Sequence, residues 1–324
     1  MSQGTGPECV VISVGAAALL PGGRPDAERF AALADDVVRM RAEGIRPVLV
    51  SAGAEAVGAA RLAAAGTSPR AVGPAARQLA AAAGQGPLFE AFRSALEARG
   101  LVAADLRLTP ADVTGRQHRA GVRSLLEAAV RAELVPVVSE NEPLTTGGPE
   151  VLAAVLAASL RAQRLLLLTH AHGGGAEDLG PGPRNRRVPE VAAVTAATAA
   201  TAAATGRLPG TAETGPDADG TPSTLRAAWV ATLAGVPVVI VGADTEDAVV
   251  RAVRGDDIGT LVHPRVCATD PDLELLGRSL LSPAPGPRPG RAGGPYAVDA
   301  VADDWRIVSR PGVRPLPTVR LATA

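Results

Sequence analysis

The sequence contains no lysine. All 32 of its lysine-plus-arginine side chains are arginines, and 33 carboxylates balance them to a formal net charge of −1. A nearly neutral chain lacks the excess of positive charge that binding along a nucleic-acid backbone requires. We therefore expect no nucleic-acid partner.

Cysteines and long apolar runs are also scarce. Cys9 and Cys267 are the two cysteines of the chain, and two residues so far apart form no disulfide framework, which fits a reducing compartment. The first residues lack the basic-then-apolar pattern of a signal peptide, and no apolar run reaches the roughly 18 residues needed to cross a bilayer. These absences predict a cytoplasmic protein with no membrane partner.

Aromatic residues make up only 2% of the 324-residue chain, although 47% of the residues are hydrophobic. The core must therefore consist mainly of leucine, valine and alanine. After Leu281 the composition shifts to proline, glycine and arginine. We expect one folded domain over residues 1–282, followed by a Pro/Gly-rich linker and a short C-terminal tail over residues 283–324 that is too small for a core of its own.

The stretch from Cys9 to Leu20, CVVISVGAAALL, is the clearest local signal. Its β-branched apolar half predicts a buried strand, and Gly15 and the alanines after it predict a tight turn with little side-chain bulk. Such a turn can bring backbone N–H groups close to an anion, or it can simply pack the chain between two elements. The residues alone leave both interpretations open.

Short apolar segments alternate with amphipathic segments along residues 9–262. This alternation predicts a three-layer α/β/α sandwich with a mostly parallel central sheet, in which ligands bind along one sheet edge. Between Pro74 and Gly100 we expect two helices, at 75–83 and 88–99, separated by Gly84-Gln-Gly86-Pro87. The other expected helices are 26–43, 56–65, 120–132, 151–161, 225–234 and 245–254; the expected strands are 10–14, 47–50, 101–108, 134–138, 164–169, 236–241 and 259–262.

Eight fragments between residues 10 and 264 resemble, in their order, the amino-acid kinase family and specifically its glutamate 5-kinase branch. They include VVISVGAAALL, VLVSAGAEAVGAARL, AARQLAAAAGQGPLFEAF, VPVVSENEP and RLLLLTHAHG. The resemblance implies the amino-acid kinase fold and transfer of a phosphoryl group from ATP, with Mg²⁺, to the side-chain carboxylate of glutamate or a related amino acid, as in proline biosynthesis. It also implies a homo-oligomer. Residues 283–324 are too short for the small C-terminal PUA domain that the family usually carries.

The resemblance also implies site residues. It places nucleotide and phosphate contacts at Ser13, Gly15, Thr169, His170, Gly173 and Thr224, and substrate contacts at Ser51, Gly53, Ala54, Glu140, Asn141 and Glu142. It assigns no catalytic residue to this chain. From the residues themselves, Glu140 to Glu142 could accept hydrogen bonds from an ammonium group or only cap a strand.

The residues at the predicted phosphate-binding positions differ from those of the family that the sequence resembles. The family's two phosphate lysines are replaced by Ser13 and Thr224, and its aspartate after the central strand is replaced by His170. His170 and His172 could be metal ligands or solvent-facing loop residues, and we expect no metal site there. Arginines that could supply the missing charge are Arg184, Arg186, Arg187 and Arg226. Two functions stay open: a phosphotransferase that uses ATP and Mg²⁺, or a catalytically impaired kinase-fold protein with a regulatory, ligand-binding or structural role and no cofactor.

Overall fold

The computed structural model forms two compact units, Met1–Pro283 and Ala284–Ala324. It describes residues 8–67, 74–109, 112–113, 115–140, 148–169, 190–191, 221–243, 245–264, 296–301 and 304–309. The first unit contains an eight-stranded sheet, and the second contains a two-stranded sheet. Each unit is described by itself below.

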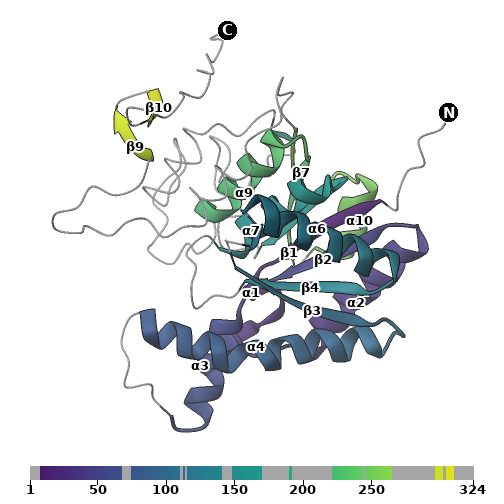
Figure 1. Cartoon of the computed structure of the whole chain (residues 1–324). Coiled ribbons are helices and arrows are strands. Elements are labelled where there is room, and N and C mark those ends of the chain that lie inside the picture. Colours follow the sequence, from purple (N-terminus) through teal and green to yellow (C-terminus); the bar gives the residue numbers. More distant parts are fainter. Residues whose placement is uncertain are drawn as a thin grey trace, which may run out of the picture. The chain divides into compact units, whose positions relative to one another are not determined.

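The eight-stranded sheet has the strand order β3-β4-β2-β1-β5-β7-β8-β6. Figure 1 shows β3, β4, β2 and β1 side by side. Six of its seven strand pairs are parallel, and β7 pairs antiparallel with β8. The predicted mostly parallel sheet is therefore confirmed. The strands are β1 (Cys9–Val14), β2 (Arg46–Ser51), β3 (Ala103–Leu108), β4 (Val135–Glu140), β5 (Arg164–Thr169), β6 (Glu190–Val191), β7 (Val238–Gly242) and β8 (Thr260–Val262).

Helices cover both faces of this sheet. One apolar cluster joins the sheet to α2, α3, α4 and α10, and a second cluster joins it to α6, α7 and α9. The predicted α/β/α layering is thus confirmed. The helices are α1 (Ala16–Leu19), α2 (Ala27–Ala42), α3 (Ala54–Ala64), α4 (Pro74–Glu97), α6 (Arg116–Arg131), α7 (Pro149–Leu160), α9 (Thr221–Leu233) and α10 (Ala248–Arg254), and a 3₁₀ turn, η1, spans Pro21–Gly23.

The strand sequences are apolar at consecutive positions because both sheet faces are covered. In β1, Val11 belongs to the cluster under α6, α7 and α9, whereas Val10 and Ile12 belong to the opposite cluster, and all three are fully buried. β1 lies between β2 and β5 and is paired with both along its length. The strand that the sequence marks most clearly is therefore in the middle of the core.

The prediction of two helices between Pro74 and Gly100 is wrong. α4 runs without interruption through Gly84, Gly86 and Pro87 to Glu97. Leu88, Phe92 and Leu96 are buried at helical spacing on the face that packs into the core, and Phe92 meets Phe30 of α2 edge to face with ring centroids 4.8 Å apart. This packing outweighs the local helix-breaking tendency of the Gly and Pro residues.

The C-terminal region holds a further difference. Residues 259–262 were expected to form the final strand, but β9 (Tyr296–Val301) and β10 (Asp304–Ser309) follow them and pair as an antiparallel hairpin. Within the described parts of the chain, none of the helices has the length and apolar character needed to pass through a bilayer.

Two glycines let α3 and α4 pack in direct contact. A Cβ atom on Gly58 of α3 would lie 1.7 Å from the carbonyl oxygen of Ala80, and one on Gly84 of α4 would lie 1.8 Å from that of Ala54. Both neighbouring atoms are backbone, so they cannot move aside as a flexible side chain can. The contact between these helices therefore depends on glycine at both positions.

We expect Gly84→Ala to destabilise the protein by about 1–3 kcal/mol, because the added methyl group would force α3 and α4 apart. Gly86→Ala is the matched control two residues along the same helix. Gly86 is exposed with no atom within 4 Å of an added Cβ, so the control should gain about 0.5–1 kcal/mol from helix propensity. Urea unfolding measures both values. Equal effects of the two substitutions would contradict the close packing.

Candidate functional site at the carboxyl ends of the parallel strands

The parallel strands end together at one edge of the sheet. Val14, the last residue of β1, is in register with Ser51 of β2 and Leu168 of β5, and Ser51 is in register with Ser139 of β4. Thr169 at the end of β5 pairs with Gly242 of β7. This alignment brings the described residues that follow β1 and β2, among them Gly15, Gly53 and Ala54, to one edge, where open α/β sheets bind ligands.

The turns after β1 and β2 touch each other. Gly53, between β2 and α3, has a φ of +105°, a conformation that residues with a side chain rarely adopt. A Cβ atom there would lie 2.3 Å from Cδ1 of Leu20 and 2.9 Å from Cβ of Ala16. The turn predicted to hold phosphate and the turn predicted to hold substrate are therefore in direct contact, and the contact requires glycine.

Gly15 is held against β5. Its N–H donates to the carbonyl oxygen of Leu168 at 3.1 Å, and a Cβ atom would lie 2.9 Å from the same oxygen. The N–H of Gly15 is thus occupied by the sheet, which favours packing over anion binding for this group. The first N–H groups of the short helix α1, which begins at Ala16, have no partner within that helix.

The two positions where the resemblance expects phosphate lysines are buried and neutral. Ser13 is 1% exposed, and its register partners Val50 and Leu167 belong to the apolar cluster under α6, α7 and α9. Thr224, in α9, is 3% exposed. Neither side chain brings a positive charge to the carboxyl edge.

Ser51 carries an unsatisfied hydroxyl group. Its side chain is buried, and within the described structure its Oγ atom has no hydrogen-bond partner. A buried polar atom left without a partner costs about 1–3 kcal/mol. The residue is one of the predicted substrate contacts, and a ligand group that reached it would remove this penalty.

A carboxylate that the sequence analysis missed lies where two helices begin. Glu150 is in the first turn of α7 and accepts a hydrogen bond from Ser223 in the first turn of α9. A Cβ atom on Gly148 would lie 3.1 Å from Oε2 of Glu150 and 3.6 Å from Cβ of Ser223. Helix N-termini stabilise negative charge. The signal available in the sequence was Pro149 followed by an acidic residue just before an Ala/Leu-rich segment, which is typical of a helix start.

Burial shifts the pKa of this carboxylate. It raises the pKa of Glu150 above the ordinary value, against the opposing effects of a backbone hydrogen bond and the hydrogen bond from Ser223. Burial also lowers the pKa of the partly buried Arg226, which is in the second turn of α9. The edge thus combines a partly buried carboxylate with one partly buried cation.

Several predicted site residues lie outside the described part of the chain. They are Asn141, Glu142, His170, Gly173 and the three arginines Arg184, Arg186 and Arg187. The backbone of Glu140 is the last of β4 and is in register with Leu108 of β3. Ala54 is buried as the first residue of α3. Among the residues that the structure describes, no three histidine, cysteine or acidic side chains are grouped so as to hold a metal ion.

We expect the stability conferred by Glu150 to fall as pH rises. In the folded protein Glu150 keeps its proton to a higher pH than in the unfolded chain, where glutamates titrate near about 4.3. As the pH rises from about 4.3 through the raised pKa of the folded protein, the free energy of unfolding therefore decreases. Glu150→Gln removes this titration, and its free energy of unfolding relative to wild type should increase between pH of about 4 and about 8. Glu28→Gln, in the exposed first turn of α2, is the control; identical pH profiles for the two variants would contradict the assignment.

Comparison with known sequences places this edge in context. The model of the "Amino acid kinase family" matches residues 8–242. A glutamate 5-kinase of Trichlorobacter lovleyi is 32% identical over 270 residues, which cover 81% of this chain and 68% of the relative. The glutamate 5-kinase of Deinococcus radiodurans is 33% identical over 279 residues, covering 84% and 73%, and that of Stutzerimonas stutzeri is 34% identical over 260 residues, covering 78% and 67%.

Two solved structures share the fold. UMP kinase from Ureaplasma parvum superposes with a TM-score of 0.52 at 13% identity and covers 80% of this chain and all of its own. Aspartate kinase from Synechocystis gives a TM-score of 0.51 at 19% identity, with 81% of this chain matched to 40% of that chain. These likenesses support the three-layer architecture. The family match over residues 8–242 and the relatives at 32–34% identity show that the chain belongs to the amino acid kinase family as a divergent, glutamate 5-kinase-like member.

Proposed function

We propose that this protein is an ATP-dependent phosphotransferase of the glutamate 5-kinase type, which transfers the γ-phosphoryl group of ATP to the side-chain carboxylate of glutamate or a related amino acid. One observation carries the proposal: identity of 32–34% to glutamate 5-kinases extends over 78–84% of the chain. On this proposal the protein is a cytoplasmic homo-oligomer that serves proline biosynthesis.

The substrate half of the edge fits the proposal. The turn over Ser51, Gly53 and Ala54 would bind the amino acid, with Glu140, Asn141 and Glu142 at the end of β4 as the partners of its ammonium group. The unsatisfied Oγ of Ser51 and the contact between the Gly53 turn and Ala16 support this assignment, because they put a hydrogen-bonding hydroxyl group beside the turn after β1.

The nucleotide half fits less completely. The resemblance assigns the phosphates of ATP and Mg²⁺ to Ser13, Gly15, Thr169, His170, Gly173 and Thr224. Of these, Ser13 and Thr224 are neutral and buried, and the N–H of Gly15 already donates to Leu168. Phosphoryl transfer depends on cations that stabilise the charge of the moving group. We propose that Arg226, a partly buried cation in the second turn of α9, supplies this charge from another face of the helix than Thr224.

The second candidate function is a catalytically impaired kinase-fold protein that binds an amino acid. The burial and neutrality of Ser13 and Thr224 favour it, because a change from lysine to arginine would have kept a positive charge at each position. Such a protein would bind glutamate at the Ser51 turn and would not turn over ATP.

A coupled ADP-release assay with Mg-ATP separates the two candidates. We expect ADP release that depends on L-glutamate, and we expect Arg226→Ala to lower kcat by about 10- to 100-fold, because loss of one charge-stabilising group costs a few kcal/mol in the transition state. Arg123→Ala is the control, since Arg123 lies on the exposed surface of α6 and pairs with Glu127. Absence of glutamate-dependent release, with glutamate binding intact by titration calorimetry, would reject the kinase in favour of the impaired protein.

Ser51→Ala tests the substrate turn separately from chemistry. Because the substitution removes an unsatisfied buried hydroxyl group, the free energy of unfolding should stay equal or rise by up to about 1 kcal/mol. Glutamate affinity measured by calorimetry should fall by about tenfold, as expected for loss of a hydrogen bond to a charged group. A destabilised variant with unchanged glutamate affinity would show that Ser51 is purely structural.

A further inference from the structure

A groove between α3 and α4 lies outside the residues assigned to the edge. Its volume is about 480 Å³, and it is lined by alanines of both helices together with Leu62, Gly66 and Thr67. Four of its lining residues are alanines, Ala59 and Ala63 from α3 and Ala76 and Ala80 from α4, and their small side chains leave the groove open. Its volume is within the range of small-molecule sites.

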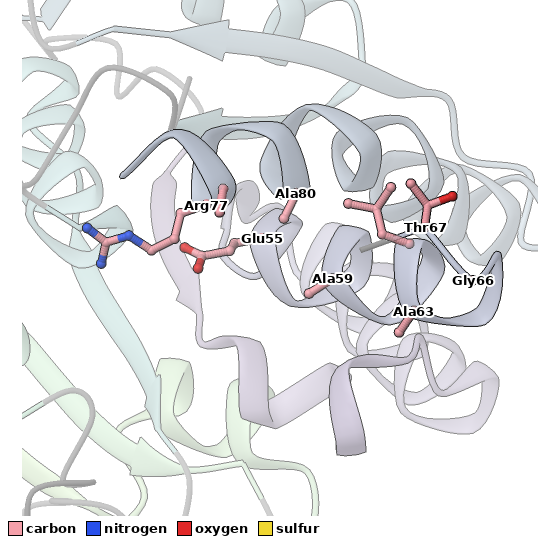
Figure 2. A pocket seen from close by; sticks show the side chains of 9 residues that line it. Glu55, Ala59, Ala63, Gly66, Thr67, Arg77 and Ala80 are labelled. Carbon is pink, nitrogen blue, oxygen red and sulfur yellow. The ribbon is translucent and has the colours of Figure 1, made fainter. Parts of the chain in front are cut away.

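Two opposite charges lie at one end of the groove. Figure 2 shows Glu55 and Arg77 there, with Ala59, Ala63 and Ala80 along the middle and Thr67 at the other end. Glu55 is in the first turn of α3 and Arg77 in the first turn of α4, and both are exposed.

Among the residues that the structure describes, several arginines and carboxylates of this helical layer form ion pairs with each other, whereas these two charges do not. Arg99, two residues after the end of α4, pairs with Asp35 of α2, and Arg93 pairs with Glu90 and Glu97 within α4. Glu55 and Arg77 line the same groove, yet within the described chain neither makes an ion pair or a hydrogen bond. The groove therefore presents an acceptor and a donor of opposite charge beside an apolar floor.

We infer that this groove binds a free α-amino acid with an aliphatic side chain. The carboxylate of Glu55 accepts from the ammonium group, the guanidinium of Arg77 donates to the carboxylate, and the aliphatic chain lies on the alanines toward Leu62. A ligand with a single charge would satisfy only one of the two groups, and an uncharged one would satisfy neither. The inference requires no phosphoryl transfer and so does not rest on the proposed function.

Occupancy of the groove has a direct route to the carboxyl edge. Glu55 follows Ala54, the buried first residue of α3, and the turn at Gly53 is in contact with Leu20 and Ala16. Gly84 of α4 packs on the backbone of Ala54. A ligand that bridges Glu55 and Arg77 would therefore tie the first turns of α3 and α4 together next to the predicted substrate turn.

Titration calorimetry and saturation-transfer NMR of the full chain with L-leucine test the inference. We expect millimolar binding of L-leucine, and binding weaker by about five- to tenfold for 4-methylpentanoate, which lacks the ammonium group, and for 3-methylbutylamine, which lacks the carboxylate. Added salt should weaken leucine binding because both charges are exposed.

Paired variants locate the site. Glu55→Gln should weaken leucine binding about five- to tenfold but leave 4-methylpentanoate unaffected, and Arg77→Gln should weaken leucine binding to the same extent but leave 3-methylbutylamine unaffected. Arg93→Gln, on the exposed surface of α4, is the charge control and should leave the binding of all three ligands unchanged. The inference is overturned if leucine fails to bind at about 20 mM, a concentration well above the millimolar dissociation constant expected for a few exposed contacts. It is also overturned if Glu55→Gln and Arg77→Gln bind leucine as the wild-type protein does. Loss of leucine binding in Ser51→Ala, at the carboxyl edge, would overturn it as well, because the ligand would then bind at that edge.

Discussion

The parallel pairing of β1 with both β2 and β5 is the constraint on which the rest of the first unit depends. It buries Val10, Val11 and Ile12 completely and divides their side chains between two apolar clusters. Because helices must cover both faces of such a sheet, the chain returns through a helix after nearly every strand. The carboxyl ends of the strands then meet at one edge, which is where the candidate site lies.

Glycine at a few positions allows neighbouring turns and helices of this layered fold to pack in close contact. Gly53 lets the turn after β2 meet the turn after β1, and Gly58 and Gly84 let α3 meet α4 backbone to backbone. Both sets of contacts involve the start of α3, because α3 begins directly after Gly53. The candidate substrate turn and the groove between α3 and α4 are therefore mechanically connected, although the residues that give each its chemistry are different.

The charges at the carboxyl edge differ from those that the resemblance to the amino-acid kinase family predicts. Buried, neutral Ser13 and Thr224 stand where cations were expected, while Glu150 and Arg226 are ionisable groups that burial shifts toward their neutral forms. This balance is why the reaction and the simple binding of an amino acid remain separate proposals with separate measurements.

The sequence by itself determined the alternation of strands and helices over most of residues 9–262, the mostly parallel sheet and the positions of the turns at Gly15 and Gly53, because these follow from local apolar patterns and from residues with special backbone freedom. The sequence predicted a helix break at Gly84 to Pro87, and this prediction is wrong. The buried face that includes Leu88 and Phe92 packs into the core and keeps α4 continuous. Only the tertiary structure brought Ser223 to Glu150, left the hydroxyl of Ser51 without a partner and set Glu55 beside Arg77 in one groove. Each of these relations joins residues from different elements, and burial and proximity across elements are properties of the packed molecule that no local pattern encodes.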